Sequence, residues 1–348
     1  MTRCNSIADL TNPQWLKTIF GPLKEINTKP FITTGFSGAV LQKIELIAAD
    51  NATRHLILKQ TNLKTDWISQ RTHDTVGREA AWLNEECLRR TWNIIHCPYI
   101  AFAKENDLTG LLMEDLSAHL FPDNREPIDI DSENIIIDTM AALHAQFWDS
   151  DDIKQLTWLT RPRDYLDILR PGDHAQDSYC PPPEPLRTNL SEGWRIAFEL
   201  LSINTMNYLT QPIEEILSSW TNLPVTLLHG DMKIANMALS PGGKLSLFDW
   251  PMIGCAPCGI ELGWYLAVNA TRLARRKEEF IHAYRSSLEC NLQEAIDDKS
   301  WKEIVKLSIV SGAMMMLWNK ALKWKSGKES DRAEWEWWSK SLELAISQ

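Results

Sequence analysis

The sequence of 348 residues has few glycines, no excess of positive charge and no long apolar run. Its net charge of -10 argues against nucleic acid as the main partner, because proteins that bind nucleic acid carry a basic surface. No stretch reaches the roughly 18 apolar residues of a membrane-spanning helix, and the first residues lack the apolar core of a signal peptide. With 44% hydrophobic and 24% charged residues, the composition is typical of globular proteins. We therefore expect a cytoplasmic protein that binds neither nucleic acid nor a membrane.

Disulfide and zinc frameworks are also missing. The seven cysteines are scattered, and an odd number of this kind is typical of free thiols in a reducing compartment. Cys255 and Cys258 have C-x-x-C spacing, but no second pair with ligand spacing exists that could complete a zinc site. A thioredoxin-like motif would open a helix after a strand, whereas this pair lies in a Pro/Gly loop. We interpret both cysteines as small residues in a turn.

The most informative pattern that is present is His229-Gly230-Asp231, followed by Asn236 and then by Asp249. Asp231 and Asn236 have the D-x-x-x-x-N spacing of a kinase catalytic loop, in which the Asp accepts the proton of the attacking hydroxyl and the Asn holds Mg²⁺. Asp249 ends a short apolar run, where a kinase has its second Mg²⁺-binding carboxylate. An isolated HGD is most often a turn closed by an Asp side chain. The joint pattern favours the catalytic interpretation.

The residues around these polar groups predict a hairpin. Residues 225–228 are strand-like and precede the HGD turn, and residues 237–239 follow Asn236. A Pro-Gly-Gly turn at 241–243 then leads to a second strand over 245–248, which delivers Asp249. We expect this hairpin to carry the polar groups towards one end.

The first ~115 residues predict mixed strands and helices, with boundaries that are loose by a few residues. Strands are expected over 39–48, 54–60 and 108–113, and a helix over 77–90. This order places Lys59 near the end of a strand. The chain then becomes largely helical from Ser132, which we expect to cap a helix, with an irregular segment over about 151–190, helices over 191–220 and further helices at the end.

The His-Gly-Asp form, in place of His-Arg-Asp, resembles the aminoglycoside phosphotransferase and choline kinase superfamily, whose members phosphorylate small molecules. The resemblance implies an α+β, two-lobed protein-kinase-like fold. Residues 1–115 would form a sheet-based, nucleotide-binding N-lobe, and residues 116–348 a mostly helical C-lobe with the catalytic hairpin and the acceptor-binding helices. It also implies ATP and Mg²⁺ as cofactors and the hydroxyl group of a small molecule as the acceptor.

The resemblance further implies a role for particular residues. Asp231 would be the catalytic base, His229 would support the loop, and Asn236 and Asp249 would hold Mg²⁺. Lys59 would contact the α- and β-phosphates, with Glu79 holding its ammonium. Glu261 stands where the family usually has Asp, and we expect it to brace the catalytic loop. The remaining nucleotide-binding residues would lie in a turn over the phosphates and in the hinge that binds the adenine edge: Gly35, Ser37, Gly38, Glu114 and Leu116.

Two other functions stay open. A protein kinase is disfavoured because the sequence has no D-F-G or A-P-E, and Asp249 is followed by Trp250-Pro251 with no evident activation segment. A non-catalytic nucleotide-binding protein of the pseudokinase type is disfavoured because such a protein would be expected to lose a metal ligand or the base. Aminoglycoside, macrolide, choline-like amine, sugar and amino-acid acceptors share this catalytic core, so the sequence names neither the acceptor nor the oligomeric state.

Overall fold

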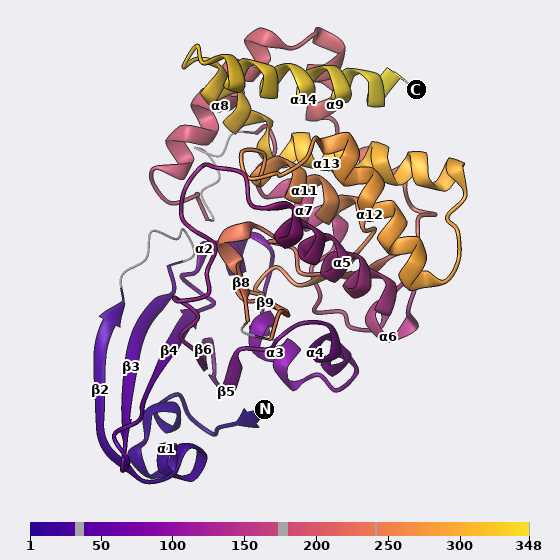
Figure 1. Ribbon diagram of the computed structural model, residues 1–348. Helices are drawn as coiled ribbons and strands as arrows, with labels where there is room; N and C mark the ends of the chain where they lie inside the picture. Colours follow the sequence, from indigo (N-terminus) through magenta and orange to yellow (C-terminus); the bar gives the residue numbers. More distant parts are fainter. Residues whose placement is uncertain (32–37, 173–179, 241, 348) are drawn as a thin grey trace. The chain divides into compact units, whose positions relative to one another are not determined.

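The computed structural model describes residues 1–31, 38–172, 180–240 and 242–347 (Figure 1). These form two compact units, residues 1–121 with 237–252 and residues 122–236 with 253–348, here called the first and second unit. The first unit is built on a sheet and the second is mostly helical, so the fold is mixed α+β. The first unit also takes in residues 237–252, which lie beyond the expected boundary at 115. The division into nucleotide- and acceptor-binding lobes stays a prediction.

A six-stranded sheet forms the frame of the first unit, in the order β1-β5-β6-β4-β3-β2. All neighbours are antiparallel except β1 and β5, which are parallel. The strands predicted over 39–48, 54–60 and 108–113 correspond to β3, β4 and β6. The strand bounds are β1 Thr2–Arg3, β2 Leu23–Phe31, β3 Val40–Ala48, β4 Thr53–Asn62, β5 Tyr99–Glu105 and β6 Leu108–Glu114.

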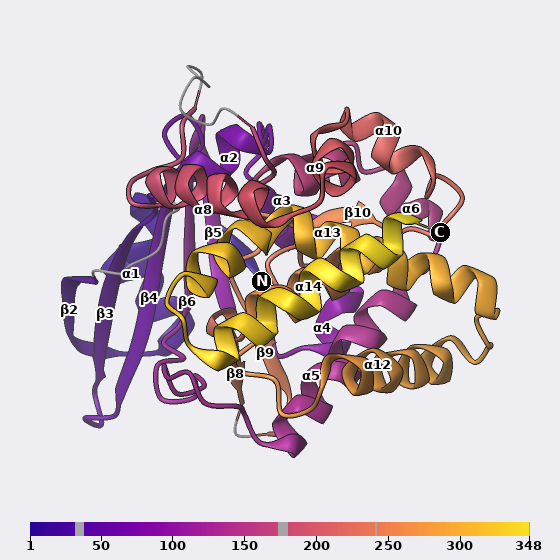
Figure 2. The same cartoon turned by 90° about the horizontal axis from the view of Figure 1, so that it is seen from above.

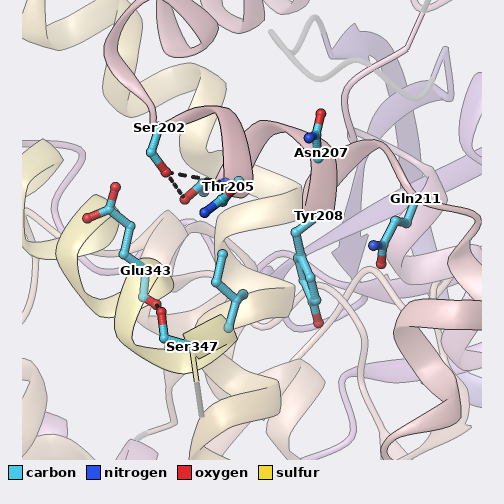
Figure 3. Close-up of a pocket in the computed structure, with 9 residues that line it drawn as sticks. Ser202, Thr205, Asn207, Tyr208, Gln211, Glu343 and Ser347 are labelled. Atoms are coloured by element: carbon cyan, nitrogen blue, oxygen red, sulfur yellow. Dashed lines mark hydrogen bonds between the residues drawn. The ribbon is translucent and has the colours of Figure 1, made fainter.

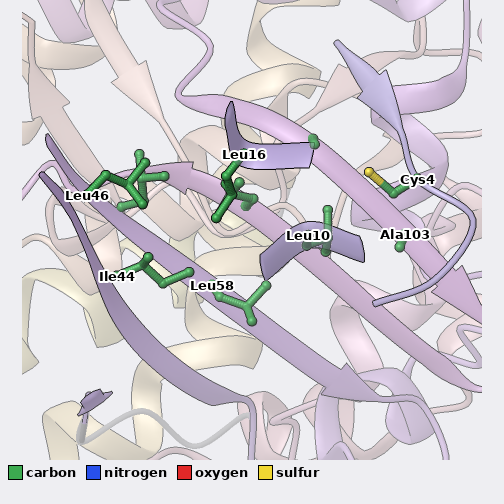
Figure 4. Packing of buried hydrophobic residues seen from close by; sticks show 10 residues of the cluster. Cys4, Leu10, Leu16, Ile44, Leu46, Leu58 and Ala103 are labelled. Atoms are coloured by element: carbon green, nitrogen blue, oxygen red, sulfur yellow. The ribbon is translucent and has the colours of Figure 1, made fainter. Parts of the chain in front are cut away.

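Alternation along β4 separates the core of this unit from its polar face. Leu56 and Leu58 belong to a buried apolar cluster, which Leu10 of η1 (Ala8–Thr11) and Leu16 of α1 (Pro13–Phe20) also join (Figure 4). Successive side chains of a strand point to opposite faces. Lys59 therefore points away from this cluster, although it is itself buried.

The helix expected over 77–90 is shorter than predicted. α3 (Arg78–Asn84) stops where Glu85 turns to an extended conformation, and its backbone N–H donates to the carbonyls of Ala81 and Trp82. Asn84, which has low helix propensity, ends the apolar periodicity at this point. The first unit also contains α2 (Trp67–Arg71), η2 (Cys87–Arg90) and α4 (Thr91–Ile94).

The predicted hairpin is confirmed in its second half. β8 (Met237–Leu239) pairs antiparallel with β9 (Leu245–Leu247), and Pro241 of the connecting turn lies outside the described residues. β7 (Thr226–Leu228), the strand before the HGD turn, pairs instead with β10 (Gly254–Ala256) in the second unit. That partner follows Asp249 in the sequence and is only three residues long, so periodicity did not reveal it.

The second unit is a helical assembly in which α13 packs against α8, α11 and α14, and α12 packs against α5. α14 lies over α13 when this unit is seen from above (Figure 2). No helix in the described part of the chain is long and apolar enough to cross a bilayer. The elements are α5 Ile130–Gln146, α6 Asp151–Lys154, α7 Pro162–Asp167, α8 Leu186–Leu200, α9 Ile203–Thr210, α10 Ile213–Ser218, η3 Ile234–Asn236, α11 Gly259–Val268, α12 Lys277–Leu292, α13 Asp298–Trp324 and α14 Glu329–Ser347.

Two helix starts differ from expectation. The cap of α5 is Asp129, whose Oδ1 accepts from the backbone N–H of Ser132 at 2.8 Å, so the prediction of Ser132 as the cap is wrong by one turn. An aspartate caps a helix as well as a serine does, and the sequence offers both. α8 begins at Leu186, inside the segment expected to be irregular. Residues 173–179 of that segment lie outside the described residues.

α11 and α13 approach each other through glycines. A Cβ added at Gly263 would lie 2.1 Å from the backbone oxygen of Ser308, and one added at Gly259 would lie 2.6 Å from that of Ile304. Gly312 of α13 faces the backbone oxygen of Gly263 in return, at 2.7 Å from its added Cβ. No larger residue fits at these positions, and the close approach fixes where α11 lies along α13.

Candidate active site

The ammonium of Lys59 is bound by two carboxylates in the first unit. Its Nζ lies 2.6 Å from Oε2 of Glu79 and 2.6 Å from Oδ1 of Asp249. Burial alone would lower the pKa of Lys59, but the charges of Asp249 and Glu79 outweigh it and raise the pKa above its ordinary value. The lysine therefore stays charged. β4, α3 and the residues just after β9 carry these three groups. The resemblance implied the pair of Lys59 with Glu79, whereas the pair with Asp249 was not predicted.

Glu79 also holds the backbone that carries Asp249. Its Oε1 accepts from the hydroxyl of Tyr99 at 2.5 Å and from the backbone N–H of Trp250 at 3.1 Å. The Tyr99 oxygen in turn accepts from the backbone N–H of Asp249 at 3.0 Å. Two successive amides of the chain are thus bound by one carboxylate and one hydroxyl.

Aromatic rings pack around this network. Trp82 stacks on Trp250 with centroids 4.2 Å apart and 18° between planes, and it meets Tyr99 edge to face at 5.7 Å. Both geometries are favourable for aromatic pairs. These rings therefore cover one side of the polar network with apolar surface. The low local dielectric that results strengthens its hydrogen bonds.

The other predicted nucleotide-binding residues of the first unit are less fully defined. Gly35 and Ser37 lie outside the described residues, while Gly38 is described and has a φ of +73°, a conformation that favours glycine. In the hinge, the backbone N–H of Glu114 donates to the carbonyl of Pro98, so it is occupied by the sheet. The backbone N–H of Leu116 has no hydrogen-bond partner among the described residues.

In the second unit, a buried carboxylate lies beneath the HGD turn. Glu261 accepts from the backbone N–H of His229 at 3.1 Å and from that of Gly230 at 2.5 Å. Gly230 has a φ of +85°, which the turn requires. Burial would raise the pKa of Glu261, but its contacts with His144, the charge of His229 and the Gly230 N–H lower it. The prediction that Glu261 braces the loop is confirmed.

Asp231 is held within its own loop. Its Oδ2 accepts from Nζ of Lys233 at 2.7 Å and from Nδ2 of Asn236 at 3.0 Å. The backbone N–H of Asp231 donates to Nδ1 of His229 at 3.2 Å, which is the supporting role expected for that histidine. Oδ1 of Asp231 has no hydrogen-bond partner in the described part of the chain. One oxygen of the carboxylate is therefore fixed by two donors, and the other is buried without a partner among the described residues.

The far end of the loop is tied to α11. Oδ1 of Asn269 accepts from the backbone N–H of Ile234 at 2.9 Å, and its Nδ2 donates to the carbonyl of Met232 at 3.2 Å. The loop is therefore anchored at both ends by one helix, through Glu261 near its start and Asn269 just after its end. Asn269 was not predicted.

Three more contributors were missed by the sequence argument. Tyr99, Trp82 and Lys233 carry no motif of their own, and their roles depend on partners far away or on local geometry. The spacing of Lys233 from Asp231 was visible in the sequence, and a basic residue inside the D-x-x-x-x-N segment was a usable signal. No comparable signal marked Tyr99, which opens β5 after a Cys-Pro pair.

Cys255 and Cys258 are both buried. Burial raises the pKa of Cys258 to about 12, so its thiol is neutral and unreactive. Cys255 belongs to β10 and Cys258 directly precedes α11. The prediction that both cysteines lie in a turn is therefore wrong for Cys255, because the segment pairs with β7 and becomes a strand.

A polar cavity of about 580 Å³ lies between α9 and α14 and contains none of the predicted site residues. In Figure 3, Tyr208, Asn207 and Gln211 project from α9 and its end, and Glu343 comes from α14. Burial raises the pKa of Tyr208 to about 12, so the phenol is neutral. The residues that line the cavity include no cation that could hold a phosphate.

A model of the phosphotransferase enzyme family matches residues 48–294, which is well over half of the chain. The protein therefore belongs to the phosphotransferase enzyme family. The expected membership is confirmed, and with it the α+β, protein-kinase-like fold. No curated protein matches the chain.

Several solved structures are similar to this chain. A choline kinase from Streptococcus pneumoniae is 14% identical, with 95% of this chain and 97% of that chain covered and a TM-score of 0.48. An ethanolamine kinase from Plasmodium vivax is 14% identical, with coverage of 95% and 85% and a TM-score of 0.49. A spectinomycin phosphotransferase in complex with ADP and spectinomycin is 12% identical, with coverage of 95% and 95% and a TM-score of 0.48. None of these likenesses identifies the acceptor of this chain.

Proposed function

We propose that this phosphotransferase is an ATP- and Mg²⁺-dependent kinase that transfers the γ-phosphate to a hydroxyl group of a small molecule. The observation that carries the proposal is the binding of one buried lysine by Glu79 and Asp249, at 2.6 Å each. A buried ion pair is weak evidence for a stabilising role, because desolvation offsets most of its attraction. Delivering an ammonium to phosphates is a better reason for the arrangement.

The residues proposed for Mg²⁺ have the donor atoms that the ion prefers. Asp249 supplies a carboxylate. Asn236 turns its Nδ2 towards Asp231, and its amide oxygen accepts no hydrogen bond from any described residue. Mg²⁺ is commonly held by one or two carboxylates with phosphate and water oxygens. It therefore does not need a cluster of three or more His, Cys, Asp or Glu, and the described residues contain none. When bound, the ion neutralises charge on the phosphates.

Asp231 is the proposed base. Lys233 and Asn236 fix its Oδ2, so Oδ1 is the atom that orients the acceptor hydroxyl and takes its proton. His229 and Glu261 hold the backbone of the loop and are not assigned a proton transfer. This division leaves Asp231 outside the metal site, which agrees with the separation of tasks that phosphoryl transfer needs.

The nucleotide would be held by the first unit. Lys59 would contact the α- and β-phosphates, Gly38 would lie in the turn over them together with Gly35 and Ser37, and Glu79 would keep the ammonium in place. In the hinge, the unpartnered N–H of Leu116 is the better donor to an adenine edge, and Glu114 would contribute through its carbonyl. ATP rather than GTP stays a prediction.

The geometry after Asp249 bears on the rival protein kinase function. Residues 250–258 are all that separate Asp249 from α11, and they include β10, which is paired with β7. This segment is too short to form a peptide-binding activation segment, and three of its residues are already paired with β7. A small-molecule acceptor is the better match.

Acceptor-dependent release of ADP tests the proposal. The purified protein would be incubated with ATP and Mg²⁺ and with pools of amines, sugars, amino acids and antibiotics that carry hydroxyl groups. We expect at least one pool to raise ADP release in the wild type and not in Asp231→Asn. Nucleotide binding without acceptor-dependent release from any pool would favour the non-catalytic alternative, and phosphorylation of protein but of no small molecule would favour a protein kinase.

A further inference from the structure

We propose that Tyr99 is a positioning residue whose hydroxyl fixes the backbone of Asp249, and thereby the carboxylate that the proposed function assigns to Mg²⁺. The inference rests on that proposed function. It goes beyond it by assigning Glu79 and Tyr99 a joint task other than holding Lys59: they bind the chain segment that carries the metal ligand.

The contacts divide the carboxylate of Glu79 in two. Oε2 accepts from Lys59, whereas Oε1 accepts from the hydroxyl of Tyr99 and from the backbone N–H of Trp250. The Tyr99 oxygen accepts from the backbone N–H of Asp249. Half of the carboxylate is therefore directed at the backbone of residues 249–250 and not at the lysine.

The direction of the bonds at Tyr99 is fixed by its chemistry. A phenol has one proton, and an ionised carboxylate can only accept, so the proton of Tyr99 goes to Glu79 and its lone pair receives the Asp249 N–H. Burial first, and then the charge of Glu79, raise the pKa of Tyr99 well above its ordinary value, so the phenol keeps this proton. Phenylalanine at this position could make neither bond.

The backbone of Asp249 needs such a support. Its φ is +68°, in the left-handed region that residues other than glycine seldom adopt. A conformation of this kind persists where the surroundings over-determine it, and it is found most often at functional sites. Here the N–H of Asp249 is bound by Tyr99, the next N–H by Glu79, and the side chain by Lys59.

Packing and hydrogen bonding can be separated at this residue. The ring of Tyr99 is held by its edge contact with Trp82, which itself stacks on Trp250. Tyr99→Phe keeps that ring and removes only the hydroxyl. Tyr265→Phe is a matched control, because Tyr265 is also fully buried and its hydroxyl has no hydrogen-bond partner among the described residues.

The experiment measures Mg²⁺ dependence without turnover. Nucleotide binding to the wild type, Tyr99→Phe and Tyr265→Phe would be followed by calorimetry over a range of Mg²⁺ concentrations. Removing a residue that orients a metal ligand usually weakens metal affinity by about 10–100-fold. We expect the half-saturating Mg²⁺ concentration to rise by about tenfold in Tyr99→Phe, with nucleotide affinity in the absence of Mg²⁺ nearly unchanged and with Tyr265→Phe like the wild type.

The outcomes separate the inference from the function on which it rests. If the wild type binds nucleotide in a Mg²⁺-dependent way and Tyr99→Phe has the same Mg²⁺ dependence, the positioning role is wrong and the function stands. If the wild type binds no nucleotide, the proposed function fails. Should Tyr99→Phe not fold, hydrogen exchange of the wild type decides: the amides of Asp249 and Trp250 must be as protected as those of β9, and fast exchange would overturn the inference.

Discussion

Nε2 of His144 lies 3.0 Å from Oε2 of Glu261, and neither side chain is exposed to solvent. The other ring nitrogen of His144 lies 2.7 Å from the hydroxyl of Tyr284, so both polar atoms of the imidazole are satisfied. The same carboxylate accepts the backbone N–H groups of His229 and Gly230. Through these three hydrogen bonds the buried Glu261 joins α5, α11 and the HGD turn. His144 therefore has a structural role.

Glu261→Gln should destabilise the protein and lower its turnover. Both carboxylate oxygens accept backbone N–H groups, and the amide nitrogen of glutamine would face one of these donors with another donor. We expect a loss of about 1–3 kcal/mol in the free energy of unfolding, the usual cost of leaving a buried polar group unsatisfied. Urea denaturation at pH 7 measures it, with the exposed Glu343 changed to Gln as the control.

The same variant gives a pH test. The folded-state pKa of Glu261 lies below its ordinary value of 4.5, so the charged form contributes stability above that pH and the contribution is lost as pH falls through the folded-state pKa. The difference between wild type and Glu261→Gln should therefore shrink at acid pH. If the difference in the free energy of unfolding stayed constant from pH 7 down to pH 3, Glu261 would not support the loop in its ionised form.

Asp249→Ala should abolish measurable transfer, because Mg²⁺ would lose its carboxylate ligand and the phosphates their neutralisation. Asn236→Ala should be damaging but less complete, since an amide is a weaker ligand and water can replace it. Steady-state assays over a range of Mg²⁺ concentrations compare the two. Near-normal turnover of Asp249→Ala at saturating Mg²⁺ would show that the metal assignment is wrong.

Lys59→Ala should weaken nucleotide use and leave acceptor binding largely intact. The ammonium is the group proposed to contact the phosphates, and a charged hydrogen bond is worth about 1.5–3 kcal/mol, so nucleotide affinity should fall by roughly 10–100-fold. Calorimetry with nucleotide and with acceptor separates the two effects. Lys64→Ala is a suitable control, because Lys64 pairs with Asp107 at the surface. A variant that lost acceptor affinity and kept nucleotide affinity would contradict the role of Lys59.

Asp231→Asn should slow transfer by roughly 10²–10⁴-fold, the usual contribution of a positioned general base. Nucleotide and Mg²⁺ binding should survive, because Asp231 is not assigned to the metal. A smaller loss is expected if the transition state is loose and Asp231 mainly orients the hydroxyl. Thermal-shift titration with nucleotide and Mg²⁺, alongside single-turnover transfer, gives both quantities. Wild-type transfer by a variant that binds nucleotide normally would remove Asp231 from catalysis.

Local patterns predicted much of the fold and the polar residues of the candidate site. The apolar run at residues 56–58 predicted a strand with Lys59 near its end, and the HGD and D-x-x-x-x-N spacings identified the loop around Asp231 without any tertiary information. The partner of β7 could not be predicted, because β10 is three residues long and pairs across an intervening hairpin. The end of α3 at Asn84 was missed because local helix propensity is a weak signal.

Supporting residues of the site were harder to predict for a physical reason. Tyr99 and Asn269 act through hydrogen bonds to backbone groups, and such contacts depend on where the chain passes rather than on a periodic pattern. Many buried tyrosines and asparagines have no such task, as the unpartnered hydroxyl of Tyr265 illustrates. Residue type alone therefore gave no means of singling them out.

Because α11 and α13 touch through glycines, a substitution at that contact would displace the HGD loop although it lies far from it in the sequence. α11 carries Glu261 and directly precedes Asn269, the two residues that anchor the loop, and its place along α13 allows no methyl group at Gly263. A random mutagenesis screen for inactive protein should then return alanine or serine at Gly263 beside the expected changes at Asp231. Such alleles would be temperature-sensitive, and second-site suppressors should map to the facing turn of α13 around Ser308 and Gly312.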